Sequence, residues 1–170
     1  PVYHSGLTAG NNIYLNGTDT EFNSGKFPQP PDENLLHIGS VNDINGSGDS
    51  FIAYCWHSVP GYSAFGSYKG SSGTDNTFVY LGFTPAFLMV KCTSHAGNWT
   101  INDTTRSPYN PSIFNLFANT NAAEVPDLDI DLLSNGFKIR EERTDIGYDN
   151  RDYVYCAFAE NPFSSPVTAR

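Results

Sequence analysis

The chain has 170 residues, enough to bury a core in one or two domains, and its 18 acidic residues outnumber its 9 basic ones. The net charge of −9 argues against a nucleic-acid partner, because phosphate binding needs clustered lysine and arginine side chains. No apolar run approaches the roughly 20 residues of a membrane helix, so we expect no membrane insertion.

Short apolar runs between turn residues predict an all-β protein. In chain order the predicted strands are Ile13–Leu15, Leu35–Ile38, Ser50–His57, Phe78–Phe83, Phe87–Cys92, Trp99–Asn102, Ile113–Phe117, Asp127–Leu133, Phe137–Arg140 and Asp152–Ala159. Gly-containing turns separate many of them, and no stretch keeps a helical apolar period. The spacing predicts an antiparallel β-sandwich, lectin-like or jelly-roll-like, built from related units in tandem.

Both faces of the predicted strand Ser50–His57 are apolar, since every residue from Phe51 to Trp56 is apolar or aromatic. A strand with two apolar faces is predicted to be buried on both sides. Asp152–Ala159 has the same character. These two segments therefore predict two related cores, or one core with internal symmetry.

The chain nearly repeats itself with a period of about 100 residues. Asp49–Pro60 (D-S-F-I-A-Y-C-W-H-S-V-P) parallels Asp152–Pro162 (D-Y-V-Y-C-A-F-A-E-N-P). In this alignment Pro1 falls in the middle of a unit. We therefore expect residues 1–69 to be the rear of a first unit whose front is missing. Residues 70–163 are expected to form a complete second unit, and residues 164–170 a loose tail. The Gly/Ser-rich stretch Lys69–Asp75 is either the boundary or a hairpin loop within one sandwich.

The block Gly48-Asp49-Ser50-Phe51 imitates the nucleophile motif of one hydrolase family. That chemistry needs a histidine base later in the chain, and none of the four histidines stands in the required Asp-x-x-His arrangement. We interpret Asp49 as the entry to a strand and predict no catalytic residue. The histidines are His4, His37, His57 and His95.

Two acidic patterns have a structural and a functional interpretation. Asp43–Asp49 resembles a calcium-binding loop, but Tyr54 stands where the ligand set needs glutamate. A turn held by Asx side chains is therefore favoured, and calcium binding stays an open alternative. Asp127, Asp129 and Asp131 alternate with apolar residues, which predicts a solvated strand face. Paired acids for sugar cleavage are the alternative.

The three cysteines, Cys55, Cys92 and Cys156, lie far apart and fit no disulfide framework or metal motif. We expect buried, inert thiols and folding in a cytosolic compartment.

Six aromatic residues can stack on sugar rings, although Trp56 is expected inside its strand, and Tyr109 in a predicted loop is the best surface candidate. The six are Trp56, Tyr62, Tyr68, Tyr80, Trp99 and Tyr109.

Several blocks resemble the C-terminal repeat module of tail-fibre and other virion structural proteins of tailed bacteriophages, especially marine podoviruses. The similarity covers nearly the whole chain in the same order. The blocks are Asp49–Tyr68, Phe78–Lys91, Gly97-Asn98-Trp99, Leu133–Ile139 and Tyr153–Phe163. The resemblance implies a module of a longer fibre-like or virion-surface protein, and it brings no catalytic or ligand-binding residue.

From these observations we predict a non-enzymatic virion structural protein, part of a tail fibre or surface appendage, that contributes to host attachment. It is expected to act as a homo-oligomer with other virion proteins, in a virion assembled in the host cytoplasm, without cofactor or metal. A lectin-like module that binds a host-surface glycan is the first alternative, and a glycan depolymerase is the second.

Overall fold

A computed structural model describes residues 1–163, and every strand pair in this part of the chain is antiparallel. The predicted all-β, antiparallel class is therefore confirmed. The elements are β1 (Asn11–Asn12), β2 (Phe22–Asn23), α1 (Asn42–Asn45), β3 (Ser63–Lys69), β4 (Phe78–Tyr80), β5 (Pro85–Cys92), β6 (Trp99–Asp103), β7 (Ser112–Phe117), β8 (Val125–Leu133), β9 (Gly136–Ile139) and β10 (Asp152–Ala159).

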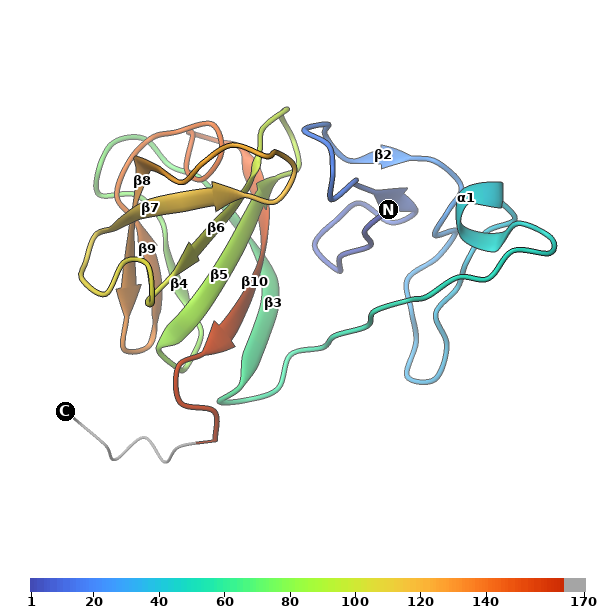
Figure 1. Ribbon diagram of the computed structural model, residues 1–170, viewed down its shortest axis with the longest axis horizontal. Helices are drawn as coiled ribbons and strands as arrows, with labels where there is room; N and C mark the ends of the chain where they lie inside the picture. Colours follow the sequence, from blue (N-terminus) through green and yellow to red (C-terminus); the bar gives the residue numbers. More distant parts are fainter. Residues whose placement is uncertain (164–170) are drawn as a thin grey trace.

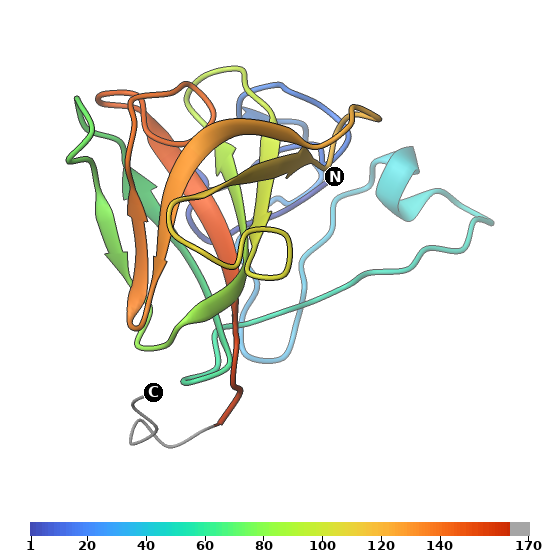
Figure 2. The ribbon, with the colours of Figure 1, turned by 60° about the vertical axis from the view of Figure 1, so that its left-hand side comes forward.

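Eight strands form one continuous sheet in the order β3-β10-β5-β6-β7-β8-β9-β4. The sheet curls around its core until it is nearly closed (Figures 1 and 2). Its edge strands, β3 and β4, are joined by a loop, and the predicted boundary Lys69–Asp75 covers the last residue of β3 and most of this loop. This loop thus connects two strands of the same sheet, and the division into units at residues 69 and 70 stays a prediction.

The core lies inside the curled sheet, where alternate strand residues point. On β8, Leu128, Ile130 and Leu132 are buried while the aspartates between them are half-buried, as the alternating pattern predicts. The largest cluster of buried side chains includes Leu88, Val90, Leu128, Ile130, Phe137, Ile139, Tyr153 and Ala157. The rings of Tyr68 and Tyr153 stack within it, with centroids 5.0 Å apart.

Residues 1–27, which we call the N-terminal lobe, cover the outer face of the sheet beside β10 (Figure 1). Leu7 and Ile13 of the lobe pack with Val154 of β10 and Trp99 of β6. Inward-pointing residues of β10 fill the core, while Val154 on its outer face is only 2% exposed. The prediction that Asp152–Ala159 is buried on both sides is confirmed at Val154, while Cys156 and Phe158 on the same outer face are half-buried.

Hydrogen bonds join the lobe to the sheet, and most of them end on main-chain carbonyl oxygens. Trp99 Nε1 donates to the oxygen of Tyr14 at 2.8 Å, and the Thr18 oxygen accepts from the Lys91 ammonium at 3.2 Å. The main-chain N–H of Glu21 donates to the main-chain oxygen of Thr93 at 3.0 Å. Lys91 is fully buried, and desolvation lowers the pKa of its ammonium.

The prediction of a buried strand at Ser50–His57 is wrong, and so is the predicted strand Leu35–Ile38. Both lie in residues 28–58, which we call the apolar arm, and the described arm contains no buried residue. It leaves the N-terminal lobe, passes through α1 and runs alongside the body to β3 (Figure 1). The local sequence favours an extended strand, but the folded chain offers this segment no neighbouring strand.

The two blocks that the sequence repeat aligns differ in structure, because Asp49–Pro60 belongs to the arm while Asp152–Ala159 forms β10. Seven predicted strands correspond to β4–β10, with small shifts at their ends. Near the predicted Ile13–Leu15 the chain forms β1 and a single bridge from Ile13 to Val2. The predicted loose tail, residues 164–170, lies outside the described residues.

Candidate functional site

The apolar arm concentrates exposed apolar side chains that a folded chain usually buries. Ile52, Tyr54 and Trp56 are 81%, 74% and 63% exposed, and the rings of Tyr54 and Trp56 stack with centroids 6.0 Å apart. Seven of the described large apolar residues that are exposed lie here: Leu35, Leu36, Ile38, Phe51, Ile52, Tyr54 and Trp56. Contiguous apolar surface of this kind marks sites of interaction with other molecules.

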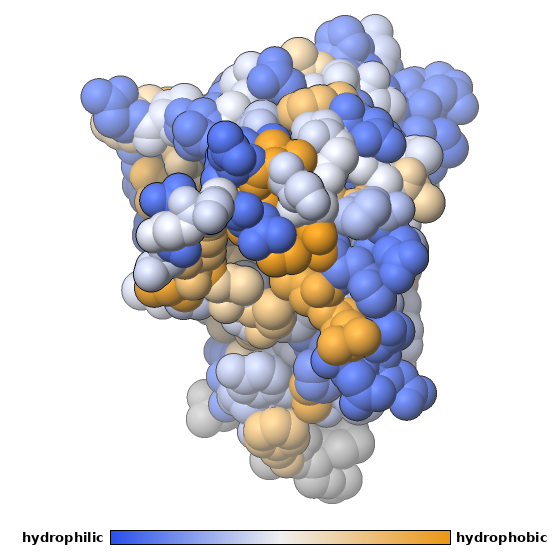
Figure 3. Space-filling model, turned by 90° about the vertical axis from the view of Figure 1, so that its right-hand side faces the viewer, coloured by the Kyte–Doolittle hydropathy of each residue, from blue (hydrophilic) through white to orange (hydrophobic). Residues whose placement is uncertain are grey.

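Figure 3 faces the side of the molecule that carries the arm. Apolar residues form a band down this face, bordered by hydrophilic residues on both sides (Figure 3). An apolar centre with a polar rim is the usual anatomy of a protein interface. The face therefore has the character of a contact surface.

The arm is held in place near α1, about its middle, and at the end that joins β3. The Lys26 ammonium lies 2.9 Å from a carboxylate oxygen of Asp43 in α1, and Gly39 N–H donates to the Lys26 oxygen at 2.7 Å. At the end that joins β3, Val59 and Ser63 form a two-hydrogen-bond bridge around a tight turn. The arm thus presents its exposed side chains from two fixed points.

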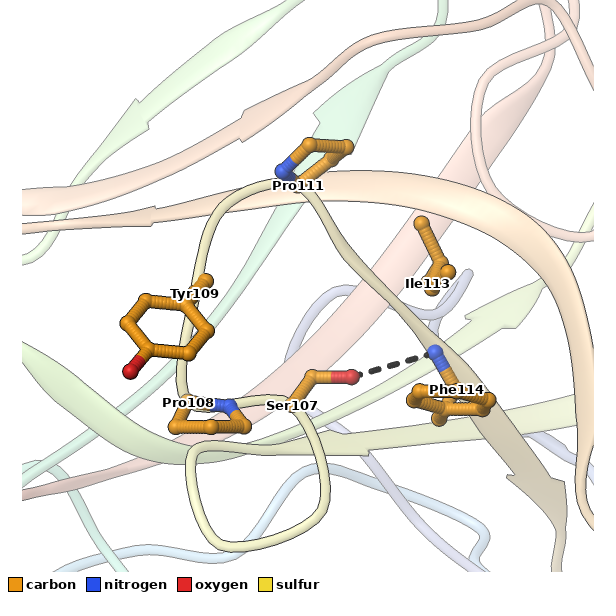
Figure 4. A pocket seen from close by; sticks show the side chains of 6 residues that line it. All are labelled: Ser107, Pro108, Tyr109, Pro111, Ile113 and Phe114. Carbon is orange, nitrogen blue, oxygen red and sulfur yellow. Dashed lines mark hydrogen bonds between the residues drawn. The ribbon is translucent and has the colours of Figure 1, made fainter.

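A second feature is a shallow pocket of about 190 Å³ in the loop that precedes β7. It is lined by Ser107, Pro108, Tyr109, Pro111, Ile113 and Phe114 (Figure 4). Ser107 Oγ accepts a hydrogen bond from Phe114 N–H at 3.2 Å. The Asn110 amide exchanges two hydrogen bonds of 2.9 Å with the main chain of Leu132, which fixes the loop to β8.

Tyr109 is 83% exposed, so the prediction that it is a surface residue is confirmed. Its ring stands beside the pocket with the phenol pointing away from the loop (Figure 4). The pocket is smaller than the roughly 300–1,000 Å³ of ordinary small-molecule sites. A ring edge or a single sugar unit would fit it better than a larger ligand.

The other aromatic candidates divide between surface and core. Trp56, expected inside a strand, is exposed, whereas Trp99 and Tyr68 are buried. Tyr68 donates a hydrogen bond of 2.5 Å to the Ile146 oxygen, and burial raises the pKa of its phenol. Tyr80 on edge strand β4 is exposed, and Tyr62 is partly exposed. Sequence reasoning missed the arm because its composition is that of a core strand.

The cysteine predictions hold in part. All three thiols are free, as expected, and Cys92 is buried. Cys55 was expected to be buried and is exposed, because its segment belongs to the arm. Cys156 is half-buried on β10, and desolvation raises the pKa of its thiol to about 11.

The two loop motifs lie on the arm. Ser50 follows Asp49 in an exposed stretch, not at the entry of a buried strand. Asp43 pairs with Lys26. Among residues 1–163, no three His, Cys, Asp or Glu side chains come together as metal ligands.

The aspartates of β8 lie on the outer face of the sheet, as predicted. Asp127 pairs with Arg143, and Asp131 lies 3.4 Å from the Arg140 guanidinium. Glu141 Oε1 accepts the N–H of Asp129 at 2.8 Å, while partial burial raises the pKa of Glu141. Since Asp127 and Asp131 are paired with arginines on a strand face, the arrangement of these acids gives no specific support to a depolymerase.

The fold and the site define an all-β, antiparallel module that carries an exposed apolar arm. Residues 1–162 match the family described as Domain of unknown function (DUF7483), and the chain belongs to that family. No curated protein and no solved structure matches the chain. Within the described residues no helix has the length and apolar character to cross a membrane.

Proposed function

We propose that this chain is a non-enzymatic structural module of a bacteriophage virion, in a tail fibre or another surface appendage. Its task in this proposal is assembly: the apolar arm attaches the module to a neighbouring protein of the particle. Tandem β-sandwich units, suggested by the likeness of Asp49–Pro60 to Asp152–Pro162, belong to the same proposal.

The exposed apolar side chains of the arm carry this proposal. Leaving Ile52, Tyr54 and Trp56 in water forgoes roughly 1.5–3 kcal/mol for each side chain that could be buried. Occupying the arm with a partner would recover part of that free energy. The virion setting is supported by the phage-like sequence blocks, and host attachment is the natural role of an appendage of this kind.

Mass spectrometry of purified particles tests the virion assignment. Peptides of this chain should be enriched in banded particles, in a fixed ratio to other structural proteins. Detection only in the unbanded supernatant would contradict the proposal.

Incorporation of arm variants tests the role of the arm. Replacing Ile52, Tyr54 and Trp56 with serine should reduce incorporation into particles, because the apolar contact surface is lost. Tyr80→Ser is the matched control, since Tyr80 is also an exposed aromatic residue but lies on β4. Equal incorporation of both variants would count against the arm as the attachment surface.

A second candidate function, favoured by the exposed ring of Tyr109 beside its pocket, is binding of a host-surface glycan. Aromatic rings in exposed loops suit contact with the apolar faces of sugars. A glycan array with the assembled protein tests this function. Binding that is abolished by Tyr109→Ala and kept by Tyr148→Ala would support it, and an array without any binding would remove it.

A further inference from the structure

We propose that residues Phe51–His57 of one copy add as an antiparallel strand to the free edge of β3 in a second copy of this chain. The inference deepens the proposed function and rests on its premise that the arm is an assembly surface. It specifies the partner and the mode of contact: strand addition, in which main-chain hydrogen bonds supply the join.

The segment Phe51–His57 has the properties of a strand that lacks a sheet. It contains neither proline nor an acidic or basic side chain other than its terminal His57, and its aromatic and β-branched residues favour strands. From Ser50 to Trp56 the main-chain N–H and C=O groups have no hydrogen-bond partner in the described chain. An extended backbone of this kind is suited to pair with a sheet edge.

The outer edge of β3 has no neighbouring strand beyond the single Val59–Ser63 bridge, and at its far end the Lys69 oxygen accepts from Thr77 Oγ1 at 2.6 Å. Ser63 bonds Val59 across this edge, and Phe65 N–H reaches the Ser58 hydroxyl at 3.0 Å. Because outward-facing groups alternate along an antiparallel strand, the N–H and C=O of Ser67 face the same edge. Within the described residues they have no hydrogen-bond partner.

The segment and the edge strand are equal in length, and an existing bridge gives a register for their pairing. Phe51–His57 and β3 (Ser63–Lys69) each contain seven residues, about 23 Å of extended chain. The Val59–Ser63 bridge already establishes an antiparallel register at this edge. Continued along the edge, that register places Cys55 opposite Ser67 and the whole segment opposite residues 65–71, of which the first five belong to β3.

The segment is held away from the β3 edge of its own copy, which points to a second copy as the acceptor. Traced back from β3, the arm runs away from the sheet towards α1 (Figure 1). There the Lys26–Asp43 ion pair ties it to the N-terminal lobe. The edge of another copy is free of this tether.

Charge also permits the contact between copies, although the chain carries a net charge of −9. Neither Phe51–His57 nor β3 contains a carboxylate, and Lys69 is the basic residue of β3. The surfaces that would meet are therefore free of the like charges that repel two copies elsewhere. Since each copy has both an arm and an edge, contacts can close a dimer or extend into a chain of copies.

Two single substitutions test the inference. Ala53→Pro removes a strand N–H from the arm, and Ser67→Pro removes the outward N–H of β3 without touching its bonds to β10. Ala53→Ser and Ser67→Ala are the matched controls. In sedimentation velocity, the wild type and both controls should form oligomers as concentration rises, whereas each proline variant alone should stay a monomer of 18.7 kDa.

Mixing the two proline variants separates contact between copies from folding of the arm onto its own edge. The Ala53→Pro copy keeps an intact edge and the Ser67→Pro copy keeps an intact arm, so their mixture should regain dimers. A mixture that stays monomeric overturns the inference. Should Ser67→Pro fail to fold by near-ultraviolet circular dichroism, Ala53→Pro carries the test, because its position has no main-chain hydrogen bond to lose.

A wild type that is monomeric at every concentration, or oligomers that Ala53→Pro leaves unchanged, would also overturn the inference. Neither result touches the proposed function, which depends on the presence of the chain in particles and on its arm-dependent incorporation. Conversely, oligomers joined by strand addition in a chain absent from particles would leave this inference standing alone.

Discussion

The His4 imidazole donates a hydrogen bond from Nε2 to the main-chain oxygen of Tyr155 at 3.1 Å, and its Nδ1 accepts the Gly6 N–H at 2.9 Å. The two bonds require the neutral ring, because a protonated Nδ1 could not accept. Burial lowers the pKa of His4, although the bond to Tyr155 opposes this shift. Neutral His4 therefore helps to hold the N-terminal lobe on β10.

Acidification should weaken this attachment. A histidine whose pKa is lower in the folded state contributes stability above its unfolded pKa of about 6.5. That stability is lost as pH falls from about 6.5 towards the lower folded pKa. Urea unfolding at a series of pH values should show the loss. The variant His4→Gln should be less stable near neutral pH and should lack this part of the pH dependence.

Because the arm is exposed, truncating two residues that the sequence repeat aligns should change the free energy of unfolding by very different amounts. Val154→Ala should lower the free energy of unfolding by about 2 kcal/mol, because it leaves a cavity between β10 and the N-terminal lobe. Ile52→Ala should change it by less than about 0.5 kcal/mol, since Ile52 is 81% exposed. Denaturant unfolding at a concentration where the chain is monomeric measures both. Similar losses for the two variants would mean that the arm is packed like β10.

The cysteines should differ in reactivity. Cys55 is exposed, so its thiol should react rapidly with a thiol reagent at about pH 8. Cys92 is buried, and burial raises the pKa of Cys156 to about 11, so both should react slowly until the chain unfolds. The absorbance of the released chromophore should show that one thiol per chain reacts rapidly. The variant Cys55→Ser should lack this rapid reaction. A rapid reaction that survives this substitution would contradict the structure.

Asn76 holds the loop between β3 and β4. Its Oδ1 accepts Ser71 N–H at 3.0 Å, while its Nδ2 donates to the Gly147 oxygen at 2.7 Å and to Glu141 at 3.3 Å. Asn76→Asp replaces the donor with a carboxylate that faces carbonyl oxygens, which should cost about 2–3 kcal/mol. Thermal unfolding measures the loss. The exposed Asn34→Asp is the control and should leave the melting temperature nearly unchanged.

The sequence could predict the inner strands because their side-chain pattern and their burial agree. On β8 the alternation of Leu128, Ile130 and Leu132 with aspartates follows directly from the two faces of a curled sheet. The sequence could not show that Ser50–His57 is exposed while Asp152–Ala159 is a buried strand, since both segments have a similar apolar composition. What distinguishes them is the presence of β3 and β5 beside β10, and strand pairing is a non-local property.

The strand β3 escaped prediction for a related reason. Its small residues make a weak apolar pattern, yet Gly66 is required by packing across the sheet. A Cβ atom at this position would lie 2.6 Å from the Tyr155 hydroxyl. The contact explains glycine within a strand, but only once the pairing of β3 with β10 is known. Of the candidate sites, Tyr109 could be predicted from its loop, whereas the arm could not.

The two partners in the hydrogen bonds between the N-terminal lobe and the sheet should differ in their sensitivity to mutation. Tyr14 and Thr18 contribute their main-chain oxygens to these bonds, and every amino acid supplies such an oxygen. The donors Trp99 and Lys91 contribute side chains that few replacements can imitate. Sequence drift should therefore be tolerated more readily at the two acceptor positions than at the two donors. The side chains at Tyr14 and Thr18 can therefore change while these two hydrogen bonds to the sheet persist.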